Sequence, residues 1–92
     1  MTPDNAPQTS CMDEARRLLA AAMDAPDLAW QIDETKDFLD AGVNSGEIIR
    51  LLFECEKHLG VEIDDAEMSS ITSLKELAAL LHRYKTGSGH VV

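Results

Sequence analysis

Apolar residues recur every three or four positions in three separate stretches of the chain, and residues that start or stop helices bound each stretch. The clearest stretch runs from Ser45 to Leu59, and Gly60 directly after it is a common helix-ending residue. Its apolar stripe is formed by Ile48, Leu52, Cys55 and Leu59, with Leu51 on one flank. This pattern predicts a helical protein.

Two further helices are expected on either side of this one. The first begins near Ser10, which with Asp13 resembles a capping box, and ends by about Asp24 because Ala25-Pro26 stops a helix. The last opens at the capping box Ser73-Leu74-Lys75-Glu76. The stripes expected to be buried are Cys11, Ala15, Leu18, Leu19 and Ala22 in the first helix, and Leu74, Leu77, Ala78, Leu81 and Tyr84 in the last.

The connection between the first two helices, residues 25–44, is longer than most helix–helix links. Gly42 is expected to take a positive φ in a turn there. A short helical turn is expected over residues 64–68. The apolar residues expected to hold the connection on the core are Leu28, Trp30, Ile32, Phe38, Leu39 and Val43. The fold class is therefore all-α: a small bundle of three full helices and a short extra one, with a long first loop.

The chain's 92 residues suffice for one domain, expected over 10–85 between a disordered tail at 1–9 and a flexible tail at 86–92. Its net charge of −9 repels nucleic acid phosphates and anionic lipid and attracts partners with basic patches. No apolar run is long enough to span a membrane, and no signal peptide is recognisable at the N-terminus. We therefore expect a cytoplasmic protein with neither nucleic acid nor membrane partners.

Catalytic and metal-binding motifs do not fit this chain. The segment around Ser45 lacks the two flanking glycines of a hydrolase elbow. A calcium-loop pattern beginning at Asp33 has Phe38 where the loop requires glycine. The histidines, which match no catalytic signature and are expected to be solvated, are His58, His82 and His90. Neither a catalytic residue nor a metal site is expected.

The two cysteines, Cys11 and Cys55, indicate no disulfide framework. Cys55 lies on the apolar stripe and is expected to be a small core residue. Cys11 stands near a helix start, where it is either an ordinary structural residue or a thiol whose ionisation the helix favours.

Asn44-Ser45-Gly46 stands where an acidic loop turns into the central helix. Ser45 fits an N-cap, whose hydroxyl accepts hydrogen bonds from first-turn amides. Asn44 fits that role as well, with Glu47 three residues later. A serine displayed for covalent modification fits the same position, so the local residues leave these alternatives open.

The segment from Phe38 to Ser45, FLDAGVNS, is followed by a helix that ends at Leu59 and continues as Gly-Val-Glu-Ile, and Thr72 precedes the last helix. This order resembles the acyl carrier and peptidyl carrier protein family, whose signature reads Asp-x-Gly-hydrophobic-Asp-Ser-Leu. In that family a helix ends near Gly-hydrophobic-Glu-Ile. The resemblance covers residues from about Glu34 to Leu81.

The resemblance implies an acyl-carrier-like four-helix bundle and a function. A phosphopantetheinyl transferase attaches 4′-phosphopantetheine from coenzyme A to the signature serine, here Ser45. The thiol of this arm holds acyl or aminoacyl groups as thioesters. The other implied partners are a loading enzyme and a downstream synthase or transferase. The carrier itself has no catalytic activity, and we expect a monomer.

Three positions depart from the family pattern: Asn44 replaces an aspartate, Gly46 an apolar residue and Arg50 a common acid. These departures favour a specialised pathway, such as polyketide, nonribosomal peptide or aminoacyl transfer, over fatty-acid synthesis. They also leave open a carrier-like scaffold that is never modified.

The residues expected to contact partners are Asn44, Gly46, Glu47, Ile49, Arg50 and Phe53. For Ile49 and Phe53 the alternative is packing in the core. For Glu47, and for its neighbours Glu54 and Glu56, the alternative to a docking role is an ordinary solvated face.

Overall fold

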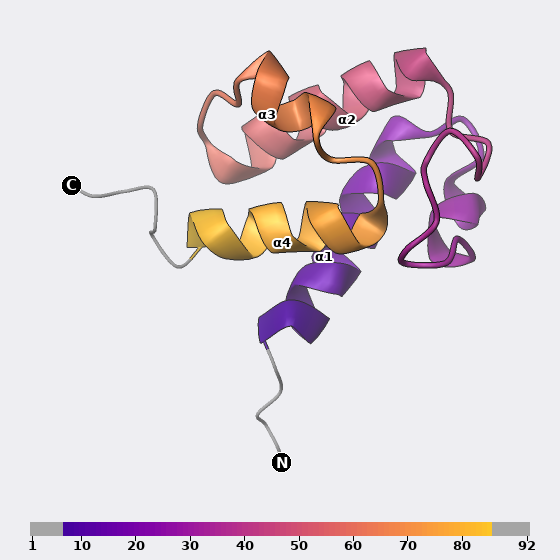
Figure 1. The fold of residues 1–92 in the computed structure, drawn as a ribbon, viewed down its shortest axis with the longest axis horizontal. Helices are drawn as coiled ribbons and strands as arrows, with labels where there is room; N and C mark the ends of the chain where they lie inside the picture. The colour runs from indigo at the N-terminus through magenta and orange to yellow at the C-terminus, as the bar shows by residue number, and fades with distance from the viewer. Residues whose placement is uncertain (1–6, 86–92) are drawn as a thin grey trace.

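The computed structural model describes residues 7–85, which form four α-helices and one 3₁₀ helix and contain no strand. The elements, in chain order, are α1 (Pro7–Ala22), η1 (Pro26–Trp30), α2 (Ser45–Leu59), α3 (Asp65–Ser69) and α4 (Leu74–Lys85) (Figure 1). The expected all-α, acyl-carrier-like bundle with a long first loop and a short third helix is therefore confirmed.

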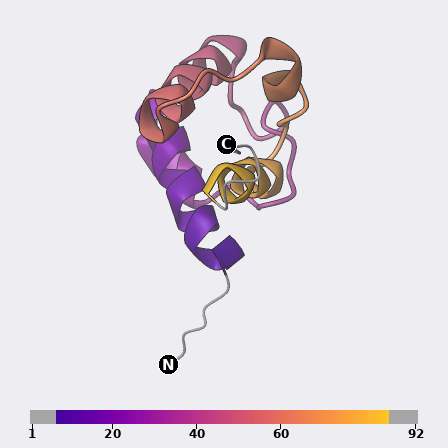
Figure 2. The same cartoon turned by 90° about the vertical axis from the view of Figure 1, so that its left-hand side faces the viewer.

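Helix α1 is the element against which most of the others pack, since it contacts α4, η1 and α2. Figure 1 shows α4 crossing α1, with α2 and α3 above them. After a turn of 90°, α4 is seen end-on (Figure 2). The core is formed by α1, α2 and α4 together with buried residues of the long connection and of α3.

The helix boundaries follow local signals closely in the second half of the chain. Helix α2 begins at Ser45 and ends at Leu59 as expected, and Gly60 after it has φ 71°, in the left-handed region. Helix α1 instead begins at Pro7, so Ser10 lies inside it and is not its start. The expected tail at 1–9 overlaps this first turn. Residues 1–6 and 86–92, where the remaining tail expectations fall, lie outside the described residues.

The buried stripes agree with the sequence pattern except in detail. On α4, Leu74, Leu77, Ala78 and Leu81 are buried as expected, Leu80 is buried in addition, and Tyr84 is only partly buried. The α2 stripe is rotated from the expected one: Leu51 and Cys55 are buried, whereas Ile48, Leu52 and Leu59 are partly exposed. Ile48 and Leu52 lie on the side of α2 that faces α3 and are packed only partly against the core.

Both cysteines are free and buried. Burial raises the pKa of the Cys55 thiol to about 12, in keeping with its expected place in the core. Burial also raises the pKa of Cys11. The alternative of a favoured thiolate at Cys11 is therefore wrong, because burial disfavours the charged form and α1 begins at Pro7, a full turn before Cys11.

The long connection is held in place from two sides. Arg16 Nη1 on α1 donates hydrogen bonds to the carbonyls of Ala29 and Ile32, both at 2.9 Å. Toward α4, the Phe38 amide donates to Thr72 O at 2.7 Å, and the Lys75 amide donates to Glu34 O at 2.9 Å. The apolar anchors Ile32, Phe38 and Val43 are buried, but the expectation was wrong for Leu28, Trp30 and Leu39, which are exposed.

Among the described residues, no helix has the length and apolar character needed to cross a bilayer.

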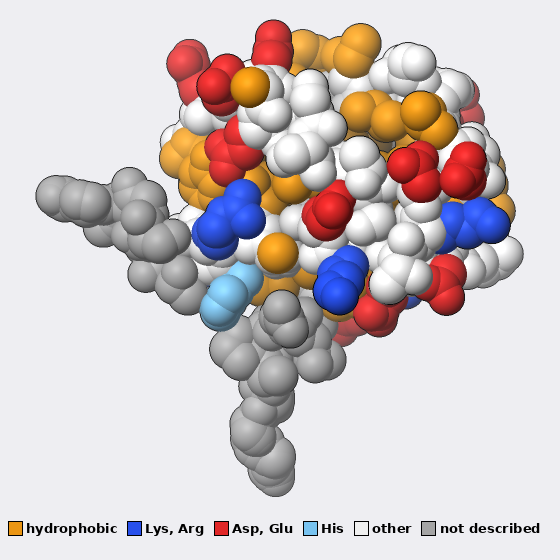
Figure 3. All heavy atoms as spheres, viewed as in Figure 1, with side chains coloured by type: hydrophobic (Ala, Val, Ile, Leu, Met, Phe, Trp, Pro, Cys, Tyr) orange, Lys and Arg blue, Asp and Glu red, His pale blue; other side chains and the backbone are white. Residues whose placement is uncertain are grey.

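On the face of the protein shown in Figure 3, acidic side chains lie next to patches of apolar side chains.

Candidate functional site

Ser45 is the first residue of α2, and it is exposed. Its hydroxyl makes no hydrogen bond within residues 7–85. The Ser45 side chain therefore does not cap the helix. The serine oxygen is therefore open to solvent at the point where the helix begins.

The N-cap of α2 is Asn44, with φ −90° and ψ 170°. Its side-chain Oδ1 accepts a hydrogen bond from the Glu47 amide at 2.8 Å, and Glu47 Oε1 accepts one from the Asn44 amide at 3.0 Å. This is a complete capping box. Asn44 is therefore the N-cap of α2, and Ser45 does not cap the helix.

Glu47 is only 5% exposed, which excludes the solvated face considered as the alternative to its expected docking role. Its second oxygen, Oε2, accepts a hydrogen bond from the Asp24 amide at 2.9 Å. The Asn-x-x-Glu spacing indicates the bond to Asn44 from sequence. The bond to Asp24 has no such signal, because its partner lies 23 positions away.

The first turn of α2 offers free donors beside Ser45. The backbone amides of Ser45 and Gly46 donate no hydrogen bond within the described part of the chain, as is usual for the first positions of a helix. Unpaired amides and the positive end of the helix dipole both favour a negatively charged group. A phosphodiester on Ser45 would meet this favourable environment.

Gly46 follows the serine without a side chain of its own. A Cβ placed on Gly46 would lie 3.4 Å from Asn44 Oδ1, which is ordinary contact, and its φ is not in the left-handed region. The glycine is therefore not required by the local backbone. Its effect is to leave the serine without a side chain on the residue that follows it.

Apolar side chains project from the surface around this turn. Ile49 is 55% exposed, and Phe53 and Leu39 are each 60% exposed, so core packing is excluded for Ile49 and Phe53. Between α2 and α3 lies a groove of about 350 Å³, lined by Ile48, Ile49, Leu52, Asp65, Met68 and Ser69. An adjoining hollow of about 160 Å³ reaches the loop at Leu39.

Charged residues on α2 are mostly engaged within the protein. Arg50 Nη1 lies 3.2 Å from Asp24 Oδ1 in an exposed ion pair. Glu56 Oε2 accepts a hydrogen bond from the Ile63 amide at 2.8 Å, so this acid holds the chain after α2. Glu54 is partly exposed and pairs with Lys57 at 3.7 Å.

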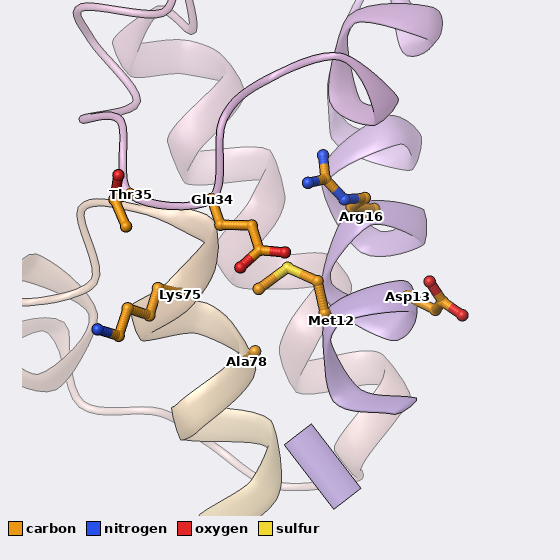
Figure 4. Close-up of a pocket in the computed structure, with 7 residues that line it drawn as sticks. All are labelled: Met12, Asp13, Arg16, Glu34, Thr35, Lys75 and Ala78. Carbon is orange, nitrogen blue, oxygen red and sulfur yellow. The ribbon is translucent and has the colours of Figure 1, made fainter. Parts of the chain in front are cut away.

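A separate cavity, of about 450 Å³, lies between α1, the loop and α4 (Figure 4). Met12 and Glu34 point into it, whereas Asp13 and Lys75 point away. Arg16, on its wall, is already bonded to loop carbonyls. None of its lining residues belongs to α2, so it is separate from the surface around Ser45.

The described residues contain no group of three His, Cys, Asp or Glu side chains placed to hold a metal ion. His58 is not simply solvated as expected, because its ring contacts the buried carboxylate of Glu14. His82 is partly buried on α4, and His90 lies outside the described residues.

Comparison with known proteins identifies one family. The model of the phosphopantetheine attachment site family matches residues 13–81, well over half of the chain. No match to a curated protein or to a solved structure was found. Members of the family carry covalently attached 4′-phosphopantetheine and work with a phosphopantetheinyl transferase and partner enzymes. The four-helix fold and the match over 13–81 together show that this chain belongs to the phosphopantetheine attachment site family and is a carrier protein.

Proposed function

We propose that this protein is a discrete carrier that bears 4′-phosphopantetheine on Ser45 and moves acyl or aminoacyl thioesters between enzymes. The observation that carries the proposal is the exposed Ser45 hydroxyl, free of hydrogen bonds within the described residues because Asn44 caps the helix. The carrier acts as a cytoplasmic monomer and has no catalytic activity of its own.

The atom that the carrier supplies to the attachment reaction is the serine oxygen. In the transferase, the Ser45 oxygen attacks the phosphorus that bears the pantetheine group of coenzyme A. The serine proton is removed, a new phosphoester bond forms and the adenosine bisphosphate leaves. The amides of Ser45 and Gly46 lie where they favour the resulting phosphodiester.

The arm then carries the cargo on its terminal thiol. A loading enzyme forms the thioester, and a downstream synthase or transferase consumes it. The apolar side chains of Ile49, Phe53 and Leu39, with Asn44 and Gly46 beside the serine, form the contact surface for these enzymes. Arg50, paired with Asp24, replaces an acid with a cation on this surface.

We place the carrier in a specialised pathway of polyketide, nonribosomal peptide or aminoacyl transfer. This proposal is supported by three positions that differ from the family pattern, Asn44, Gly46 and Arg50. These differences change the surface that partner enzymes contact. Mass spectrometry of the intact protein from its native host tests this directly, because the mass reports the arm and its cargo together.

The attachment site is tested by incubation with coenzyme A and a transferase. We expect the mass of one phosphopantetheine to be added to the wild type and none to Ser45→Ala. A gain that persists in Ser45→Ala would place the arm elsewhere, and the absence of any gain with several transferases would reject the modified carrier.

A second candidate is an unmodified carrier-like binding module. The neutral Asn44 and the bare Gly46 beside the serine favour it, because both remove features that a transferase reads in the family. This candidate predicts partner complexes that Ser45→Ala leaves intact. A pull-down with both proteins distinguishes the two, since a carrier that hands over a thioester depends on the serine.

A further inference from the structure

We propose that Glu47 is a positioning residue for phosphopantetheine transfer, because its buried carboxylate fixes the first turn of α2, and with it Ser45, against the end of α1. This inference rests on the proposed function, which makes Ser45 the acceptor. It assigns Glu47 a role inside the protein instead of the docking role expected from its position.

The carboxylate joins two distant segments of the backbone. Oε1 accepts the Asn44 amide at 3.0 Å, and Oε2 accepts the Asp24 amide at 2.9 Å. Asp24 lies just beyond the end of α1, whereas Asn44 is the N-cap of α2. One side chain therefore connects both ends of the long loop.

Ser45 lies inside the segment that this connection holds. Asn44 before it and Glu47 after it exchange two hydrogen bonds: the Asn44 amide donates to Glu47 Oε1, and the Glu47 amide donates to Asn44 Oδ1. Ser45 forms no bond through its own hydroxyl, and Gly46 has no side chain with which to pack. The placement of the serine oxygen is therefore set by its neighbours, and glycine at the next position makes this support more important.

Burial strengthens the connection and removes it from partners. With 5% of its surface exposed, Glu47 is shielded from water that would compete for the two amides, and hydrogen bonds to a carboxylate are stronger than neutral ones. The ion pair between Arg50 and Asp24 crosses the same junction, but both side chains are mostly exposed, so it adds little. Glu47 therefore makes the main contact between the end of α1 and the start of α2.

The position of a nucleophile affects chemistry more than binding. A serine oxygen that drifts from its place loses alignment with the phosphorus, which lowers kcat. A docking acid would act differently: its loss would raise KM and weaken the dependence of the rate on salt. Whether the loss of Glu47 lowers kcat or raises KM therefore identifies its role.

The test compares Glu47→Gln with the matched variant Glu76→Gln. Glu76 occupies the first turn of α4, where Oε1 accepts the Thr72 amide and the Thr72 hydroxyl, both at 2.8 Å. The same substitution at Glu76 weakens the start of α4, a helix that does not contain Ser45. In Glu47→Gln the side-chain oxygen accepts only one of the two amides, and its NH₂ group opposes the other.

Both variants of the full chain are assayed with coenzyme A and a phosphopantetheinyl transferase that modifies the wild type. Amide hydrogen exchange is measured at Asp24 and Asn44. For Glu47→Gln we expect kcat to fall on the order of tenfold, with KM within about twofold of the wild type. The two amides should exchange faster, and Glu76→Gln should keep the wild-type kcat.

A wild-type kcat in Glu47→Gln, or a raised KM with unchanged kcat, would overturn the positioning role and leave the proposed function standing. A wild type that takes no arm from any transferase would overturn the proposed function, and this inference with it. Should Glu47→Gln fail to fold, Glu47→Asp keeps the carboxylate but shortens its reach, and the same expectations apply.

Discussion

The ammonium of Lys85 in the last turn of α4 lies 2.7 Å from the carboxylate of Glu14 on α1. The other oxygen of Glu14 contacts the ring of His58 near the end of α2. One buried acid therefore links three helices. Burial by itself would raise the pKa of Glu14, but hydrogen bonds from Lys85 and His58 outweigh burial and hold it below the ordinary value.

Acidification is expected to weaken the fold through Glu14. A carboxyl whose pKa is lower in the folded state adds stability above its unfolded pKa and loses it as pH falls through the folded one. Urea unfolding from neutral pH to below the ordinary value of 4.5 should show a steeper loss for the wild type than for Glu14→Gln. The exposed Glu62→Gln should follow the wild type; equal slopes for wild type and Glu14→Gln would contradict this role.

Arg16 should contribute to stability through the loop. Replacement by methionine keeps much of the apolar stem but removes both bonds to the carbonyls of Ala29 and Ile32, at a cost of about 1–3 kcal/mol in the free energy of unfolding. Thermal or urea unfolding measures this. The neighbouring Arg17 is exposed, so Arg17→Met should stay within about 0.5 kcal/mol of the wild type. Similar losses in both variants would argue against the loop contact.

Alanine should have opposite effects at two glycines. At Gly46 the added Cβ makes ordinary contact and the backbone is helical, so Gly46→Ala should stabilise by about 0.5–1 kcal/mol. At Gly60, with φ 71°, Gly60→Ala should destabilise by about 1–2 kcal/mol. Urea unfolding compares them, and destabilisation by Gly46→Ala would show that this glycine is structurally required.

Phe53 is expected to contribute to contacts with partner enzymes and little to the stability of the fold. Because it is 60% exposed, Phe53→Ala should change the free energy of unfolding by less than about 1 kcal/mol. We expect the same change to lower kcat/KM for loading of the arm about tenfold, through loss of an aromatic contact. Lys57→Ala, an exposed change on the same helix, is the control, and equal kinetics in both variants would remove Phe53 from the contact surface.

The cysteines should be inert in the native state. With the pKa of Cys55 raised to about 12 and that of Cys11 also raised, little thiolate is present at neutral pH. Alkylation by iodoacetamide, followed by mass, should be slow without denaturant and complete with it. Rapid native labelling of Cys55 would indicate that the core opens at α2.

Much of the fold could be predicted from the sequence because local residues determine it. Asn44 and Gly60 bound α2 on both sides, and the α4 capping residues act within one turn. The start of α1 was missed because Pro7 at the first position favours a helix that the later Ser10-Asp13 pair does not mark.

The missed features are contacts between segments far apart in the chain. Glu14, Arg16 and Glu47 all look like surface residues in a helical pattern, and each is bonded to a partner at least 13 positions away. Periodicity assigns a polar residue to the outside, and it contains no information on a polar partner brought in by folding. Leu39 is the converse case: an apolar residue in the loop before Ser45 is expected to anchor the loop, but it is exposed.

The loop before Ser45 is bonded to α1 through Arg16, to Thr72 just before α4 through Phe38, and to α4 itself through Lys75. These bonds hold the loop against the helices. For the proposed carrier, the reach of the cargo from Ser45 would then depend on the length of the arm, and a longer or shorter arm would change the effective concentration of cargo at an acceptor without any change in the protein.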